Sequence, residues 1–279
     1  MALCRESPMP HPSVLAEIVL VAPGPPGPGR LAPDTSGPGL SGPGATGLGP
    51  SGPGPSGPGP SGPGPSGYLR VRLDRPERRN ALDAGMTRAL LDIVRADPAV
   101  PVLLESTNPT AFCAGADLTV PDRERAEVSD LLYQCYEAMV TRPGPVIAVV
   151  EGPAVGGGAQ LAGAADLRIA GPRGRFRWAG PPDRDLAVGA WLLPDLIGRG
   201  AALELTLTGR WVEAAEAQQL GLANLVVDEP GKVAAKLARG LLARGTGAAG
   251  NVKLIASAGG LLDRLRAERE ANRAAWGGA

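Results

Sequence analysis

The stretch PVIAVVEGPAVGGGAQLAGAADLRIA, residues 145–170, decides the fold of this chain. Its apolar run VIAVV (146–150) is typical of a buried strand. A glycine turn follows at 152–158, then a short helix of small residues at 160–165 and a second strand, DLRIA, at 166–170. Strands that alternate with helices in this way predict an α/β fold with parallel strands.

The segments on either side repeat this alternation. We expect strands at 68–73 (YLRVRL), 101–105 (PVLLE) and 224–227, and a helix over 123–141. Asn80 is predicted to open an amphipathic helix with four apolar residues on one face: Leu82, Met86, Leu90 and Ile93. The last 50 or so residues are Ala-rich, and we expect them to be helical with one apolar stripe made of Leu254, Ile255, Leu261, Leu262, Leu265 and Trp276.

The N-terminal part of the chain is of two kinds. Residues 13–22 contain the apolar run VLAEIVLVA, which Glu17 interrupts. The run is too short to span a bilayer and has no signal-peptide cleavage site, so we expect a half-buried strand. Residues 23–67 are mostly Gly, Pro and Ser, and 37–66 repeat every five residues, which excludes collagen. We predict a flexible spacer that is either a tolerated loop expansion or a segment that binds a partner.

Composition excludes several classes of function. The net charge is +0 and the pI is near 6.6, so neither nucleic acid nor a membrane is expected as a partner. The single histidine, His11, leaves no candidate for a Ser-His-Asp or Cys-His enzyme or a His metal site. The three cysteines, Cys4, Cys113 and Cys135, lack metal-ligand spacing, which indicates reduced thiols, a cytoplasmic location and no metal.

Two glycine-containing segments share one design, AFCAGADL (111–118) and EGPAVGGGAQ (151–160). Each follows a strand, and glycine there lets a backbone N–H approach a ligand closely. Two such groups aimed at one point would form an oxyanion hole. The alternative is a tight strand–helix connection without a ligand. Neither segment has the pattern of a P-loop or of a dinucleotide-binding fingerprint.

These motifs together resemble the crotonase, or enoyl-CoA hydratase/isomerase, superfamily. The resemblance rests on RPERRNAL (75–82), the two glycine segments, WLLPDLIGRGAALELTLTGRWVEAAEAQQLGLANLVV (191–227) and the helical tail. It implies a spiral of ββα turns with a C-terminal helical region that trimerises. The expected division is an N-terminal segment (1–22), the spacer (23–67) in the turn of the first hairpin, a crotonase-like core (68–228) and the helical region (229–279).

The resemblance also implies a chemistry. An acyl-CoA thioester would bind with its carbonyl oxygen between the backbone N–H groups of Ala116 and Gly157, which would stabilise an enolate. Coenzyme A enters as part of the substrate, no other cofactor is expected, and the assembly would be a homotrimer or a dimer of trimers. The residues expected to contact the substrate are Arg78, Ala81, Ala114, Asp117, Leu118, Gly156, Trp178, Gly180 and Lys253. Trp178 either lines the acyl pocket or packs beneath it, and Lys253 either meets a CoA phosphate or is a solvated surface lysine.

The sequence departs from the family where its hydratases carry two glutamates. The first position is Gln160, and the second falls on Gly180 or Pro181. A glutamine can hold a water but cannot accept its proton near neutral pH. Asp183 is a candidate replacement if its loop is shifted into the pocket; otherwise it is a solvated loop carboxylate paired with Arg184 or another arginine. Tyr133 or Tyr136 could act as a weak acid at the acyl end.

Two functions from different classes follow. The first is a crotonase-family lyase or isomerase that stabilises an enolate but is a poor hydratase. The second is a non-catalytic crotonase-like subunit that binds CoA thioesters or supports a partner enzyme. The absence of a basic–aromatic stripe argues against a nucleic-acid binder.

Overall fold

The computed structural model describes residues 13–20 and 67–277. The predicted spacer, His11 and Cys4 lie outside these residues. The first strands are β1 (Val14–Leu20), β2 (Gly67–Leu73), β3 (Val102–Ser106), β4 (Val146–Val150) and β6 (Leu167–Ala170). Shorter strands are β5 (Pro153–Val155), β7 (Arg175–Arg177), β8 (Trp211–Glu213) and β9 (Leu225–Val226).

The helices lie between and after these strands. They are α1 (Ala84–Ala96), α2 (Asp122–Thr141), α3 (Gly157–Gly163), α4 (Leu193–Ile197), α5 (Arg199–Thr208), α6 (Ala214–Leu220), α7 (Pro230–Arg244), α8 (Thr246–Ala256) and α9 (Gly260–Ala275). A 3-10 turn, η1, spans Pro76–Arg78. Among the described residues, no helix is both long and apolar enough to cross a membrane.

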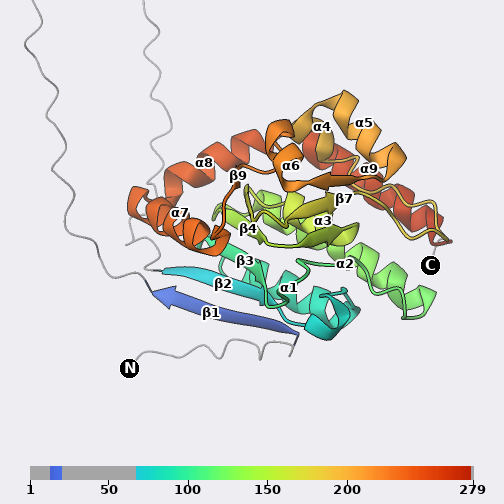
Figure 1. The fold of residues 1–279 in the computed structure, drawn as a ribbon, viewed down its shortest axis with the longest axis horizontal. Coiled ribbons are helices and arrows are strands. Elements are labelled where there is room, and N and C mark those ends of the chain that lie inside the picture. The colour runs from blue at the N-terminus through green and yellow to red at the C-terminus, as the bar shows by residue number, and fades with distance from the viewer. Residues whose placement is uncertain (1–12, 21–66, 278–279) are drawn as a thin grey trace, which may run out of the picture.

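The described strands form a six-stranded sheet in the order β1-β2-β3-β4-β6-β9 and a three-stranded sheet in the order β5-β7-β8. In the larger sheet β1 is antiparallel to β2, and every other neighbouring pair is parallel. This arrangement confirms the predicted α/β class with parallel strands. In Figure 1, α8 and α9 lie at the side of the molecule opposite to β1 and β2.

Alternate residues of the central strands face two different cores. On β4, Val146, Ala148 and Val150 join the large core that includes residues of α1 and α2. Ile147 and Val149 point to the other face, where they pack with α7. Because the side-chain period of a strand is two, a continuous apolar run such as VIAVV can cover both faces of a buried parallel sheet.

The predicted start of the first amphipathic helix at Asn80 is wrong. The helix α1 begins at Ala84, and Asp83 caps it by accepting a 2.8 Å hydrogen bond from Met86 N–H. Asn80 instead adopts a left-handed conformation with φ 54°, which a helix cannot contain. Its buried side chain accepts from Arg75 N–H at 2.8 Å and donates to the Phe112 carbonyl at 3.0 Å.

The predicted apolar stripe of the tail is interrupted. Gly259, with φ +80°, separates α8 from α9, so the two helices do not share one face. Leu265 is fully buried, whereas Leu254 and Ile255 are 47% and 77% exposed. Only the α9 part of the stripe docks on the core, and the predicted assembly into trimers stays a prediction.

We expect Asn80→Ala to lower the free energy of unfolding by about 2–4 kcal/mol, because buried backbone groups lose their partners and the left-handed turn loses its favoured residue type. Urea unfolding followed by circular dichroism measures this change. Asn251→Ala, at an exposed position of α8, is the matched control and should change the value by less than about 0.5 kcal/mol. Equal effects of both substitutions would contradict this reading of Asn80.

Candidate functional site

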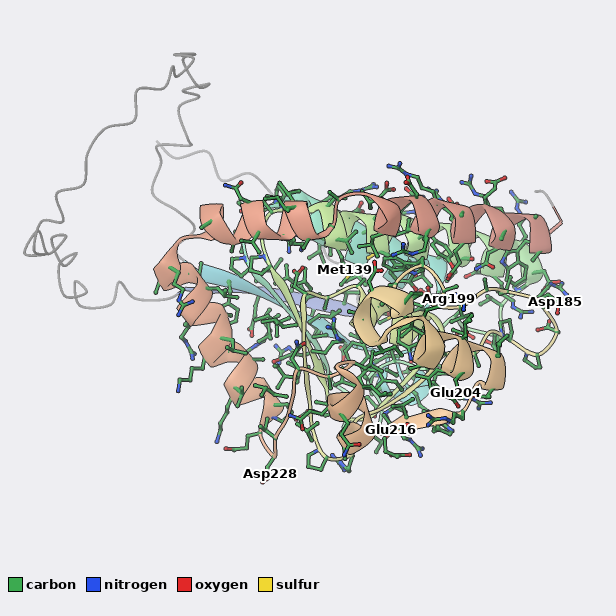
Figure 2. The ribbon with its side chains drawn as sticks, turned by 90° about the horizontal axis from the view of Figure 1, so that it is seen from above. Met139, Asp185, Arg199, Glu204, Glu216 and Asp228 are labelled. Carbon is green, nitrogen blue, oxygen red and sulfur yellow. The ribbon has the colours of Figure 1, made fainter. Side chains whose placement is uncertain are left out.

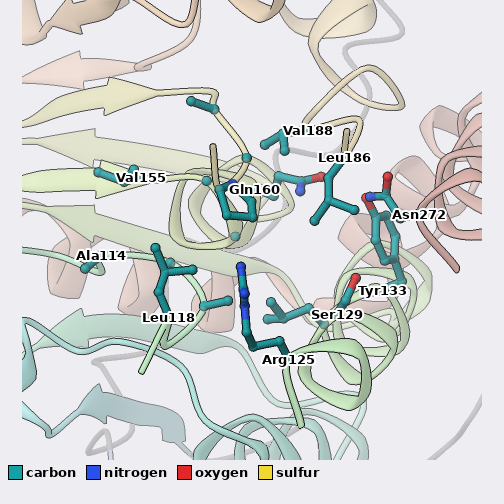
Figure 3. Close-up of a pocket in the computed structure, with 18 of the residues that line it drawn as sticks. Ala114, Leu118, Arg125, Ser129, Tyr133, Val155, Gln160, Leu186, Val188 and Asn272 are labelled. Carbon is teal, nitrogen blue, oxygen red and sulfur yellow. The ribbon is translucent and has the colours of Figure 1, made fainter. Parts of the chain in front are cut away.

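The candidate site is a cavity of about 150 Å³ between the two glycine segments and the helices α2 and α9. Figure 3 shows its lining: Ala114, Leu118 and Val155 lie at one end, and Tyr133 and Asn272 at the other. Gln160, Leu186 and Val188 lie between these ends. Leu118, at 55% exposure, marks the side that opens to solvent.

The two glycine segments pair through their backbones. Phe112 N–H donates to the Pro153 carbonyl at 3.0 Å, and Val155 N–H donates to the Cys113 carbonyl at 3.0 Å. An added Cβ at Gly158 would lie 2.5 Å from that same Cys113 carbonyl oxygen. Glycine at 158 is therefore required for the approach of the two segments.

The pairing brings two N–H groups to the same cavity. Ala116 and Gly157 both line it, and an added Cβ at Gly157 would lie 3.8 Å from Ala116 N. The neighbouring amides are occupied: Asp117 N–H donates to the Leu82 carbonyl and Gly156 N–H to the Arg177 carbonyl. By contrast, neither Ala116 N–H nor Gly157 N–H forms a hydrogen bond to any residue that the structure describes.

Gly156 and Tyr136 hold this arrangement in place. Gly156 has φ +52°, a conformation that L side chains rarely adopt, and its added Cβ would lie 2.9 Å from the Ala179 carbonyl oxygen. The Tyr136 hydroxyl donates to the Gly157 carbonyl at 2.9 Å, and its ring stacks on Trp191 at 5.9 Å between centroids. These contacts fix the backbone at Gly156 and Gly157 on the side of the cavity formed by α3.

A buried polar network closes the far end of the cavity. Trp191 Nε1–H donates to Gln160 Oε1 at 2.7 Å. The Tyr133 hydroxyl donates to Glu268 Oε1 at 2.7 Å and accepts from Asn272 Nδ2 at 2.8 Å. Burial raises the pKa of both Tyr133 and Glu268.

Charged residues gather at the outer side. Arg125 on α2 is buried and forms ion pairs with Asp122 at 3.0 Å and Asp183 at 2.9 Å. Arg184 pairs with the same Asp122. The Trp276 ring lies 5.1 Å from the Arg125 guanidinium and 5.3 Å from that of Arg184. These contacts tie the 181–188 loop to α2 and to the end of α9.

The structure places seven of the predicted site residues on the cavity lining. They are Ala114, Ala116, Leu118, Gly156, Gly157, Gln160 and Gly180. Pro181 lines it as well, so both positions at which the second family glutamate could fall are exposed to the cavity. Neither glycine nor proline has a side chain that can transfer a proton.

The structure decides between two alternatives each for Trp178 and Asp183, and it corrects the predicted role of Lys253. Trp178 is 1% exposed and packs against Gly189 beneath the site instead of lining it. Lys253 is buried, where Nζ donates to the Met139 carbonyl and to Asp166 Oδ2, both at 2.7 Å, so it is not free to meet a CoA phosphate. The Asp183 carboxylate faces Arg125, not the cavity, and that guanidinium lowers the pKa of Asp183 to about 2.

Arg78, Ala81 and Asp117 lie outside this cavity lining. Asp117 is buried, pairs with Arg75 at 3.3 Å and accepts hydrogen bonds from Thr119. Its carboxylate therefore holds the turn before α2. The predicted contacts of these residues with the CoA part of a substrate stay predictions. Asp185, the other acid of the loop, is exposed at the outer edge of the molecule (Figure 2).

Sequence reasoning proposed Tyr133 or Tyr136 at the acyl end but missed the other residues that the helices contribute. Ser129 and Arg125 lie one and two turns before Tyr133 on the same face of α2. Asn272 on α9 and Trp276 directly after this helix follow Glu268 at intervals of four. This helical spacing is visible in the sequence, but spacing alone does not show which face of a helix borders a cavity.

Comparison with known proteins agrees with this architecture. Residues 64–272 match the protein family described as enoyl-CoA hydratase/isomerase. Solved structures with the same fold include an enoyl-CoA hydratase from Mycobacterium avium subsp. paratuberculosis, with TM-score 0.68 and 27% identity over 76% of this chain and 91% of that one. A monofunctional enoyl-CoA isomerase from Mycobacterium smegmatis has TM-score 0.58 and 30% identity over 75% and 96% of the two chains.

Curated relatives are similar in sequence as well. "Probable enoyl-CoA hydratase echA6" of Mycobacterium bovis is 36% identical over 164 residues, which is 57% of this chain and 66% of that protein. The protein of the same name from Mycobacterium leprae is 37% identical over 57% of this chain and 68% of its own length. The chain thus spans about two thirds of the length of these relatives.

Cys113, which lies beside the two amides, should be chemically inert. Burial raises the pKa of Cys113 and Cys135 to about 12, so about one thiol in ten thousand is ionised at pH 8. We expect iodoacetamide to leave both unlabelled in the native chain and to label both after unfolding in guanidinium, as measured by peptide mass spectrometry. Rapid native labelling of Cys113 would show that the segment 111–118 is not packed as described.

Proposed function

Because the chain belongs to the enoyl-CoA hydratase/isomerase family, we propose that its cavity binds an acyl-CoA thioester and stabilises the enolate formed from it. The carbonyl oxygen lies between the Ala116 and Gly157 N–H groups. Electron density that moves onto this oxygen is stabilised by two donors that need no reorganisation. In a comparable site, one such donor contributes roughly a hundredfold to a thousandfold in rate.

The observation that carries this proposal is the pair of unoccupied amides on one apolar cavity. Buried backbone N–H groups are almost always paired within a protein. Two neighbouring amides that lack protein acceptors and share a cavity therefore point to a ligand oxygen. The glycines at 115, 156 and 158 allow this backbone path, since a side chain at each would collide with a backbone atom less than 3 Å away.

Ordinary hydration is proposed to be slow. Within the described residues, no Asp or Glu lines the cavity. Gln160 offers an amide in place of a carboxylate, and its oxygen is already held by Trp191. A lyase or isomerase reaction driven mainly by the two amides demands less from side chains than the addition of water.

The same absence of carboxylates supports a second candidate function. A non-catalytic subunit would bind CoA thioesters at the two amides without turning them over. Tight binding with no conversion of any member of a panel of acyl-CoA thioesters would favour this candidate, and conversion of any member would favour the enzyme.

Gly157→Ala tests the pair of amides. The new methyl group would press on Leu132 Cδ1 at 2.9 Å and lie near Ala116 N, so we expect about tenfold weaker binding of butyryl-CoA. Isotope-edited infrared spectroscopy of a ¹³C-labelled thioester carbonyl should show a lowered stretching frequency in the wild type and little shift in the variant. Gly200→Ala, which has no atom within 4 Å of the added Cβ, is the control. A bound thioester whose carbonyl frequency is unshifted in the wild type would overturn the proposal.

Gln160→Glu tests the missing proton-transfer group. A carboxylate at this position can accept a proton from water, so we expect hydration of crotonyl-CoA to rise by about tenfold or more over the wild type. Loss of the enoyl absorbance measures the rate. Gln218→Glu makes the same change at an exposed position and should leave the rate unchanged. Wild-type hydration as fast as that of the variant would contradict the inferred absence of an acid or base.

A further inference from the structure

Arg125 is the single cation among the described residues that line the cavity. Three other polar side chains of the lining are held by the protein: Gln160 accepts from Trp191, and Tyr133 bonds to Asn272 and to Glu268. Trp276 Nε1–H, also on the lining, has no acceptor among the described residues. Figure 3 shows the Arg125 side chain directed into the pocket, beside Leu118 and Ser129.

The hydrogen bonds of Arg125 leave one edge of its guanidinium free. A guanidinium has five N–H groups in a planar fork. Nη1 donates to Asp183 Oδ2 at 2.9 Å and to Asp122 Oδ1 at 3.0 Å, and Nη2 donates to Asp183 Oδ1 at 3.0 Å. Nε–H and the second N–H of Nη2, which lie side by side on one edge, have no acceptor in the part of the chain that the structure describes.

The Arg125 guanidinium is more buried than the carboxylates that hold it. Both aspartates are about half exposed, whereas Arg125 itself is 7% exposed. The two carboxylates thus lie nearer to solvent than the guanidinium, which lines the cavity. Trp276, 5.1 Å from the guanidinium, and the bidentate contact with Asp183 fix its orientation.

We propose that Arg125 selects acyl-CoA thioesters whose acyl chain carries a carboxylate, and that this carboxylate binds the free Nε–Nη2 edge. The inference rests on the proposed function, since it needs the thioester to lie between the two amides. A carboxylate matches two parallel N–H donors in geometry and charge. The hydrogen bonds to Asp183 and Asp122 raise the pKa of Arg125, so it stays charged when the ligand binds.

We expect a moderate preference for carboxylated over neutral thioesters, because only a short-range contact favours the carboxylate. Arg125 and Arg184 already balance Asp122 and Asp183, so the cluster has no net charge to attract an anion from a distance. The gain comes from the short-range bidentate contact. Hydrogen bonds to charged groups of this kind give about 10-fold to 100-fold in affinity.

Isothermal titration calorimetry with two matched pairs of thioesters tests this inference. The pairs are succinyl-CoA with butyryl-CoA and glutaryl-CoA with pentanoyl-CoA. For at least one pair we expect the wild type to bind the carboxylated member about 10-fold or more tightly. Arg125→Gln should reduce the preference to within about twofold without weakening the neutral member. Arg125→Lys keeps the charge but lacks the planar edge, so it should also lose most of the preference.

Arg123→Gln is the control, because Arg123 is exposed on the same helix and does not line the cavity. It should keep the preference, and melting curves verify that each variant is folded. If Arg125→Gln does not fold, Arg125→Lys decides the outcome. Neutral thioesters that bind with a shifted carbonyl but no carboxylate preference would overturn the role of Arg125 and leave the proposed function intact. A preference that survives both substitutions would also overturn it. Failure of every thioester to bind would overturn both.

Discussion

The close approach of two backbone segments, 111–118 and 152–158, is the constraint on which the rest of the site depends. The segments pair through the Phe112–Pro153 and Val155–Cys113 hydrogen bonds, and Gly158 lies so near Cys113 that a Cβ would overlap the carbonyl oxygen. This contact fixes where each segment turns. It also brings Ala116 and Gly157 to the cavity lining, where their N–H groups have no acceptor among the described residues.

The carboxylates near the cavity are held by other protein groups. The nearby carboxylates are directed elsewhere: Glu268 accepts hydrogen bonds from Tyr133, Gly189 and Trp191, and Asp183 is bound by Arg125. The groups that we propose to act on a ligand are therefore the two backbone N–H donors and the guanidinium of Arg125 on α2. A site with this distribution of charge is suited to holding an anion that forms on a thioester oxygen.

Much of the fold could be predicted from local patterns, and several site details could not. The run VIAVV predicts β4, and the small residues after it predict a short helix at 160–165, whereas α3 begins three residues earlier, at Gly157. Asparagine is a common helix-capping residue, so the sequence pattern predicts the start of α1 at Asn80. In the structure the Asn80 side chain instead bonds to Arg75 N–H and to the Phe112 carbonyl, and the second partner is 32 residues away in the sequence. Lys253 was misplaced for a similar reason: its partner Asp166 is 87 residues away.

The sequence by itself determined the parallel α/β class, the two glycine segments with their candidate amides, and the lack of a glutamate at Gln160, since each of these depends on residue type and short-range spacing. Only the tertiary structure decided which side chains border the cavity. Arg125, Tyr133 and Asn272 come from two helices that are more than a hundred residues apart, and Trp178 and Asp183 are turned away from the ligand space. Which side chains border the cavity depends on how the helices pack against the sheet. A helical face has the same residue spacing in the sequence whether it borders the core, solvent or a cavity.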